Sequence, residues 1–303
     1  MATTYTHITE NKTKTVIIVG FFLFLIIGVG YIMALSFDIY WLFPVAVVIA
    51  SVQAITSYWW SDKITLAISG ANKVEKINEP ELYRLVENLS IASGLPMPGV
   101  YVIEDMAPNA FATGRNPEHS AIAVTRGLLI KLSKPQLEGV LAHEFSHIGN
   151  DDILLQTVMV VLVGVVVMIS DWFLRISFSS GLDNDNNDSS QAHLIFMAAG
   201  IALALLSPLF ATLIQLSVSR QREYLADASG ALLTRNPEGL ASALEVISAD
   251  SVPLAHANKA TAHMYIANPL ADHKGSARGW FAGMFSTHPP AEERIKELRE
   301  MAL

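Results

Sequence analysis

The sequence predicts an α-helical membrane protein in which four transmembrane helices carry an α+β domain on the cytoplasmic side. Three observations predict this fold class: long apolar segments, few charged residues, and Lys and Arg that gather on one side of the segments. Of the 303 residues, 51% are hydrophobic and 16% are charged, whereas soluble domains carry about 25% charged residues. Each apolar segment meets or approaches the roughly 20 residues that a helix needs to cross a bilayer.

The apolar segments form two pairs, which we expect to be two transmembrane hairpins. They span residues 16–35, 39–60, 153–169 and 194–218. A signal peptide is an alternative for the first segment, but its apolar stretch is too long and a second span follows almost at once. The expected division of the chain is an N-terminus (1–15), a first hairpin (16–60), a first part of the polar domain (61–152), a second hairpin (153–218) with an external loop (170–193), and a second part of the domain (219–303).

The distribution of positive charge predicts the orientation in the membrane. If the connections 36–38 and 170–193 lie outside, Arg175 is the only Lys or Arg that lies outside with them, which is a strong positive-inside pattern. We therefore expect a multi-pass protein of the cytoplasmic (inner) membrane with both termini and the polar domain in the cytoplasm. The net charge of −8 offers no basic patch, so no nucleic-acid partner is expected.

Residues 61–152 are typical of a small mixed α/β unit. An amphipathic helix is expected over 80–93, with Pro80 in its first turn and Gly94 at its C-terminal end. Short apolar or alternating runs at 100–103, 110–113 and 121–125 predict strands. Ser133 and Gln136 then form a capping-box pattern, so a further helix should begin there.

That further helix carries the motif His-Glu-x-x-His at 143–147. His143 and His147 are four residues apart, so both imidazoles project from one helix face and can bind one zinc ion. Glu144 is rotated by about 100° from His143, which suits a base that takes a proton from water activated beside the metal. The alternative is a pair of surface histidines on an amphipathic helix. Because the chain has no cysteine, disulfides and thiolate zinc sites are excluded.

A catalytic zinc site needs a third protein ligand, and Glu223 is the candidate because it lies just beyond the fourth expected span. Asp227 follows one helical turn later and could accept the second N–H of a ligating histidine. Both carboxylates could instead be solvated helix charges. The other histidines that compete for the third position are His119, His256, His263, His273 and His288.

These residues resemble the HtpX family of membrane zinc metalloproteases, which is related to the CAAX prenyl endopeptidases and the wider gluzincin group. The resemblance covers nearly the whole chain, including the order of the motifs and the four spans. It rests on Asn-Ala-Phe-Ala-Thr-Gly at 109–114, His-Glu-x-x-His at 143–147, Glu-Tyr-Leu-Ala-Asp at 223–227, and Thr-His-Pro-Pro at 287–290 followed by Glu293 and Arg294.

The resemblance implies a zincin-like catalytic domain with one zinc ion per chain, Glu223 as third ligand and Asp227 as its companion. It implies that His288 and Arg294 donate hydrogen bonds to the oxyanion; the alternative is a proline-capped helix start with one surface arginine. It also implies an edge strand that binds the substrate backbone by strand addition, for which an ordinary hairpin strand is the alternative. The residues of this strand are Asn109, Ala110, Phe111 and Ala112.

We therefore expect a zinc-dependent endopeptidase that uses Glu144 as general base and cleaves misfolded or damaged polypeptides beside a lipid bilayer, as part of protein quality control under stress. The chain has four expected spans, whereas the prenyl endopeptidases have seven. Prenyl-protein processing is therefore the alternative function rather than the main one. A non-catalytic zinc scaffold would not need Glu144. A channel or transporter usually carries ionisable groups inside its spans, and these spans have none. Homo-oligomerisation is left open.

Overall fold

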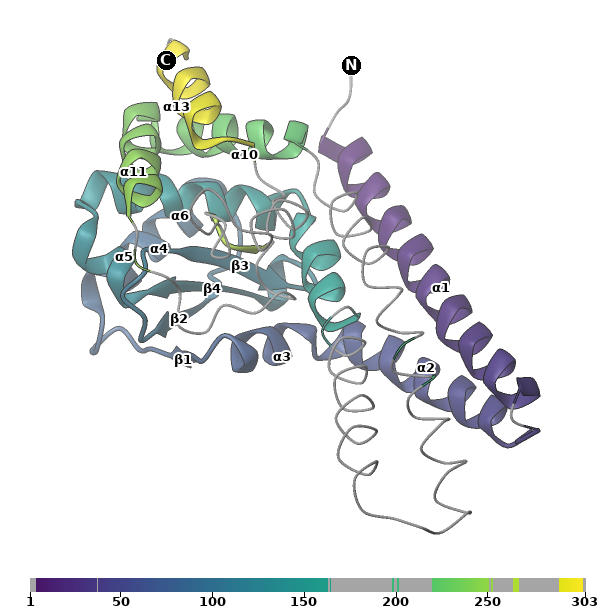
Figure 1. Ribbon diagram of the computed structural model, residues 1–303. Helices are drawn as coiled ribbons and strands as arrows, with labels where there is room; N and C mark the ends of the chain where they lie inside the picture. Colours follow the sequence, from purple (N-terminus) through teal and green to yellow (C-terminus); the bar gives the residue numbers. More distant parts are fainter. Residues whose placement is uncertain are drawn as a thin grey trace.

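The computed structural model describes residues 4–36, 38–162, 164, 198, 201, 220–250, 252, 264–266 and 289–301. A layered α/β body carries a pair of long helices that project away from it (Figure 1). The helix pair comes first along the chain, and the strands and the other described helices of the body follow it.

The projecting pair consists of α1 (Thr4–Ser36) and α2 (Leu42–Trp59), which lie side by side (Figure 1). Within the described ranges, two helices are long and apolar enough to cross a membrane, Asn11–Ile32 and Leu42–Trp59. Helix α1 already begins at Thr4, so most of the expected N-terminal tail is helical. The third expected span begins as the helix Asp152–Leu162; its remainder and almost all of the fourth expected span lie outside the described residues.

The body is built on a four-stranded mixed sheet, counted over the described part of the chain, with the strand order β1-β2-β4-β3. Strands β2 and β4 run parallel, and both outer pairs are antiparallel. Strand β3 therefore forms one edge of the sheet. The strands are β1 (Ala71–Lys73), β2 (Gly99–Ile103), β3 (Ala110–Gly114) and β4 (Ser120–Thr125), with a short 3-10 helix, η1 (Pro117–His119), between the last two.

The three strands expected from the sequence are confirmed as β2, β3 and β4. The sequence does not predict β1. Strand β1 is only three residues long and largely exposed, so it has no apolar alternation from which it could be predicted. It is paired with β2 and follows directly on α3 (Ser61–Ile68), which continues from the base of α2.

Helices cover the sheet on both faces (Figure 1). One core packs the sheet against α4 (Pro80–Ser93), α6 (Lys134–Gly149) and α11 (Pro237–Ala249). The other core lies on the opposite face and includes Leu66 of α3, Phe111 and Tyr265. Successive side chains of β3 point to opposite faces of the sheet. Ala110 and Ala112 therefore belong to the first core and Phe111 to the second. The remaining described helices are α5 (Arg126–Lys131), α10 (Arg220–Thr234) and α13 (Ala291–Glu300).

The ends of α4 and α6 follow the signals in the sequence. Helix α4 has Pro80 in its first turn and ends at Gly94, whose φ of 70° is the left-handed conformation that glycine adopts without strain. At the start of α6, the backbone N–H of Ser133 donates to Gln136 Oε1 at 2.9 Å, as in a capping box. The expected helix 80–93 and the expected start of α6 are confirmed.

Helix α6 packs so closely against α11 that one position between them has no room for a side chain. A Cβ added to Gly139 would lie 2.6 Å from the backbone nitrogen of Leu240 and 2.9 Å from its Cα. Backbone atoms cannot yield as a flexible side chain can. Gly139 therefore determines how near α11 lies to the helix that carries the histidine motif.

We expect the replacement Gly139→Ala to destabilise the protein by about 1–3 kcal/mol, because the added methyl group forces α6 and α11 apart. The measurement is the thermal midpoint of the detergent-solubilised full-length protein. Gly20→Ala on α1 is the matched control, since a Cβ there meets nothing within 4 Å. Equal midpoints for the two variants would contradict the close packing.

Candidate metal centre

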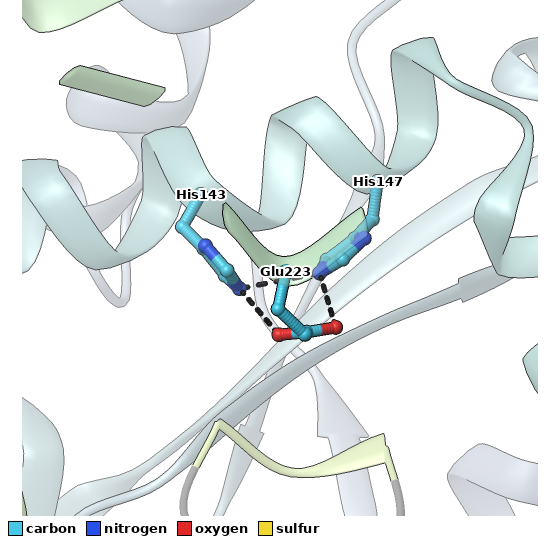
Figure 2. A group of neighbouring side chains, drawn as sticks. All are labelled: His143, His147 and Glu223. Carbon is cyan, nitrogen blue, oxygen red and sulfur yellow. Dashed lines mark hydrogen bonds and ion pairs between the residues drawn. The ribbon is translucent and has the colours of Figure 1, made fainter. Parts of the chain in front are cut away.

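Helix α6 presents two histidines side by side from one face (Figure 2). Their separation of four residues places His147 one turn beyond His143, and the two Nε2 atoms are 3.2 Å apart. Both side chains are buried, at 0% and 4% exposure. The helix thus aims two nitrogen donors at the same point inside the protein.

Glu223 supplies a carboxylate at that point from a different helix, α10. Its Oε2 lies 3.7 Å from His143 Nε2 and its Oε1 lies 3.7 Å from His147 Nε2. Figure 2 shows the carboxylate facing both imidazoles. Glu223 is fully buried, and one ligand atom of each of the three residues falls within 4.8 Å of the others.

The donor set and its spacing fit a divalent metal ion. Donor atoms that share one tetrahedral zinc ion at about 2.0–2.2 Å lie roughly 3.3 Å from one another. The observed separations of 3.2 and 3.7 Å bracket that value. Two imidazoles and one carboxylate are also the ligand types of a catalytic zinc site, in which a fourth position remains for water or substrate.

Each histidine is held from behind by a buried carboxylate. His143 Nδ1 lies 2.9 Å from Asp227 Oδ1, and His147 Nδ1 lies 3.1 Å from Asp152 Oδ2. Such contacts place the proton on Nδ1 and leave the lone pair of Nε2 for a metal ion. Sequence reasoning found Asp227 but missed Asp152. Asp152 follows the end of α6, where the left-handed backbone of Asp151 (φ 54°) turns the chain, so helical spacing does not reveal the contact.

Arg294, which the resemblance places beside the reacting carbonyl, donates to Asp227 on the Nδ1 side of His143. Its Nε and Nη2 atoms lie 2.8 and 2.7 Å from the two carboxylate oxygens, a two-pronged geometry that strengthens the pair. Arg294 is 1% exposed. Burial raises the pKa of Asp227, but the positive charge and hydrogen bonds of Arg294, with the bond to His143, lower it to about 2.

The electrostatics around His147 favour a positive charge. Burial lowers the pKa of His147, but the negative charges of Glu223 and Asp152, the hydrogen bond to Asp152 and the charge of Glu144 together raise it to about 9. A proton and a metal cation respond to the same field. The pocket is therefore suited to a cation at the position that the two histidines share.

Glu144 follows His143 on α6 and is 2% exposed. Its carboxylate contributes to the negative charge that raises the pKa of His147. Four of the five rival histidines, His256, His263, His273 and His288, lie outside the described residues. The fifth, His119, is on η1, and its Nδ1 lies 2.8 Å from Asn116 Oδ1.

The edge strand β3 is partly covered in the structure. The N–H of Ile266 donates to the carbonyl oxygen of Ala110 at 3.1 Å, and the Tyr265 ring meets Phe111 edge-to-face at 5.2 Å. Asn109 is buried, and its side-chain oxygen accepts from the N–H of Ala110. Because alternate residues of a strand direct their backbone groups to the same side, Ala112 presents its N–H and C=O on the edge to which Ala110 points.

The comparisons with known proteins agree on one family for this chain. Residues 76–302 match the model of peptidase family M48. The chain is 42% identical over 301 residues to a protease HtpX homolog of Tropheryma whipplei, with 98% of both chains covered. It is 43% identical over 303 residues to a protease HtpX homolog of Dictyoglomus turgidum, covering 99% of this chain and 95% of the relative. The chain belongs to peptidase family M48, among its HtpX members.

A solved structure, the crystal structure of S. mikatae Ste24p, is similar with a TM-score of 0.47 and 18% identity. That match covers 96% of this chain, which spans about two thirds (66%) of the length of Ste24p. Membership of family M48 makes the chain a membrane metallopeptidase, and the grouping of His143, His147 and Glu223 fits its metal site.

We expect Gly230→Ala to weaken metal binding by roughly tenfold or more, the size of effect seen when the support of a ligand is disturbed. A Cβ at Gly230 would lie 2.9 Å from the backbone nitrogen of His143, so α10 must move away and take Glu223 with it. Competition with a chromogenic chelator measures the affinity. Gly149→Ala is the control, because its Cβ meets only Leu95 Cδ1, at 3.4 Å; equal affinities would contradict the role of Gly230.

Proposed function

We propose that this membrane metallopeptidase uses one zinc ion per chain and cleaves unfolded or damaged segments of membrane and cytosolic proteins beside the bilayer. The observation that carries the proposal is the buried group of His143, His147 and Glu223, with a carboxylate behind each histidine. The ligand types favour zinc over magnesium or calcium, which prefer oxygen ligands.

Each residue of the centre has a distinct task in the proposed mechanism. His143, His147 and Glu223 hold the metal, and bound zinc supplies a Lewis acid that acidifies water and polarises the scissile carbonyl. Glu144 takes the proton from the attacking water and passes it to the leaving amine. Asp227 and Asp152 keep the two imidazoles in the orientation and tautomer that metal binding needs. The same scheme gives His288 a hydrogen bond to the oxyanion.

The edge of β3 is the proposed binding site for the substrate backbone. An extended peptide can pair with an exposed strand edge through main-chain hydrogen bonds, which are largely independent of sequence. Within the described ranges, the N–H of Ile266 donates a hydrogen bond to the carbonyl oxygen of Ala110. The next outward-facing N–H and C=O along the edge are those of Ala112. Strand addition selects segments that are already unfolded, as a quality-control protease requires.

The proposed placement is the cytoplasmic (inner) membrane, with four spans and with the metal centre and both termini in the cytoplasm. The apolar hairpin of α1 and α2 and the one-sided distribution of Lys and Arg support it. The centre is tied to the N-terminal part of α1 through Asn11 and Asp152. Substrates would therefore be met close to the membrane surface.

We expect Glu144→Gln to lower kcat for casein cleavage by about 10²–10⁴-fold, because the amide cannot accept the proton of the attacking water. The variant should still bind one zinc ion, since Glu144 is not among the proposed ligands. Metal analysis and the cleavage assay are made on the same preparation. Glu138→Gln on the same helix is the control and should keep full activity. A fully active Glu144→Gln protein would refute the general-base role.

We expect Ala112→Pro to raise KM for an unfolded substrate by about fivefold, the effect of one lost hydrogen bond of about 1 kcal/mol. Proline removes the outward N–H, which takes no part in the pairing of β3 with β4, so the replacement is compatible with an edge strand. Because Ala112 is buried in the first core, the proline ring should lower the thermal midpoint, but zinc affinity should stay close to that of the wild type. Ala112→Gly keeps the N–H and serves as control. An unchanged KM in a folded Ala112→Pro protein would exclude pairing at this position.

A further inference from the structure

The carboxylate of Asp152 joins three parts of the chain that are distant in sequence. Its Oδ2 lies 3.1 Å from His147 Nδ1. Its Oδ1 accepts from Asn11 Nδ2 at 2.7 Å and from Arg222 Nη1 at 3.3 Å. Asp152 is 1% exposed. The orientation of its carboxylate, and with it that of the His147 ring, thus depends on groups from α1 and α10.

Asn11 is the unexpected partner, because it belongs to α1 and stands at the start of the first apolar helix segment, Asn11–Ile32. It is 3% exposed, and 141 residues separate it from Asp152. Its amide group makes a second bond, to the carbonyl oxygen of Asn150 at 3.2 Å. Next to it, Lys12 pairs with Asp151 at 3.2 Å. Helix α1 is therefore bonded along the whole turn that follows α6.

We propose that Asn11 is a positioning residue for the metal ligand His147 and that it acts through Asp152. The first membrane helix is then part of the metal centre as well as an anchor. The inference rests on the metal site of the proposed function. It predicts that His147 is correctly oriented only when α1 is docked against the turn between α6 and the helix Asp152–Leu162.

The chemistry of the amide explains why asparagine suits this place. An ionised carboxylate is an acceptor only and needs donors for its remaining lone pairs when it is buried. The two N–H groups of the Asn11 amide can serve Asp152 and Asn150 at once. The amide is neutral, so it orients the carboxylate without cancelling its negative charge, which remains available to His147 Nδ1–H.

If Asn11 served only to fill space, a replacement of the same shape would preserve its role. An isosteric Asp would fill the same space but place a second carboxylate against Asp152, where like charges repel. Alanine would leave that space empty. Among the contacts that the structure describes, Arg222 would then be the remaining donor to Asp152 Oδ1. The two replacements therefore separate hydrogen bonding from shape.

The test uses the full-length protein in lipid nanodiscs, with zinc affinity measured by chelator competition and the ligand geometry by the absorption spectrum of the Co²⁺-substituted protein. We expect Asn11→Ala to weaken zinc binding about 3–10-fold, at the lower end of the range for groups that support a ligand indirectly. Asn11→Asp should weaken it at least as much, and both should alter the Co²⁺ spectrum. Gly20→Ala, on the same helix, should stay within about twofold of the wild type, because a Cβ there meets nothing within 4 Å.

A double-mutant comparison isolates the route through Asp152. In the Asp152→Ala background, the additional replacement Asn11→Ala should change neither zinc affinity nor the Co²⁺ spectrum. An equal effect of Asn11→Ala in both backgrounds would overturn the proposal, and so would wild-type affinity and spectrum in both Asn11 variants. Failure of the metal centre itself would be recognised separately, because the wild-type protein would then bind no zinc or would keep its affinity after Glu223→Ala.

Discussion

The close approach of α10 to α6 is the constraint on which the metal centre depends. Two histidines on one helix cannot complete a metal site by themselves, and the proposed third donor, Glu223, comes from α10. Gly230 lets the two helices meet backbone to backbone beside His143. Since Glu223, Asp227 and Gly230 are spaced by four and three residues, they share one face of α10. A single contact surface thus supplies the ligand, the support of His143 and the space for both.

Several of the buried charges are stabilised by a partner of opposite charge or by a hydrogen-bond donor. Ion pairs in protein interiors recover their desolvation cost only when hydrogen bonds satisfy the charged groups, and removal of one partner is strongly destabilising. Arg294 from α13 holds Asp227, while Asn11 and Arg222 hold Asp152. These pairs connect α1, α10 and α13 to the histidines of α6. The charge network that positions the ligands therefore also fastens the outer helices to the body.

The sheet contributes the edge strand rather than any ligand. Strand β3 has one neighbour in the sheet, so its other side is available to the segment at Ile266 and, as we propose, to a substrate backbone. Its alternating side chains pack into both cores, which keeps the edge rigid. In this arrangement, α1, the edge strand and the residues of the metal centre are positioned by contacts with α6 or with the turn that follows it.

Local patterns in the sequence determined the apolar hairpin, the ends of α4 and α6, three of the four strands and the pairing of His143 with His147. Such features follow from helical or strand periodicity and from capping, which operate over a few residues. Position and helical spacing made Glu223 and Asp227 candidates, and the family resemblance assigned their roles. Only the tertiary structure showed the contacts of Asp152, Asn11 and Arg294 around the histidines. These residues lie beyond the end of α6 or on distant helices, and backbone geometry does not relate them to the histidines, so their contacts exist only once the helices have packed.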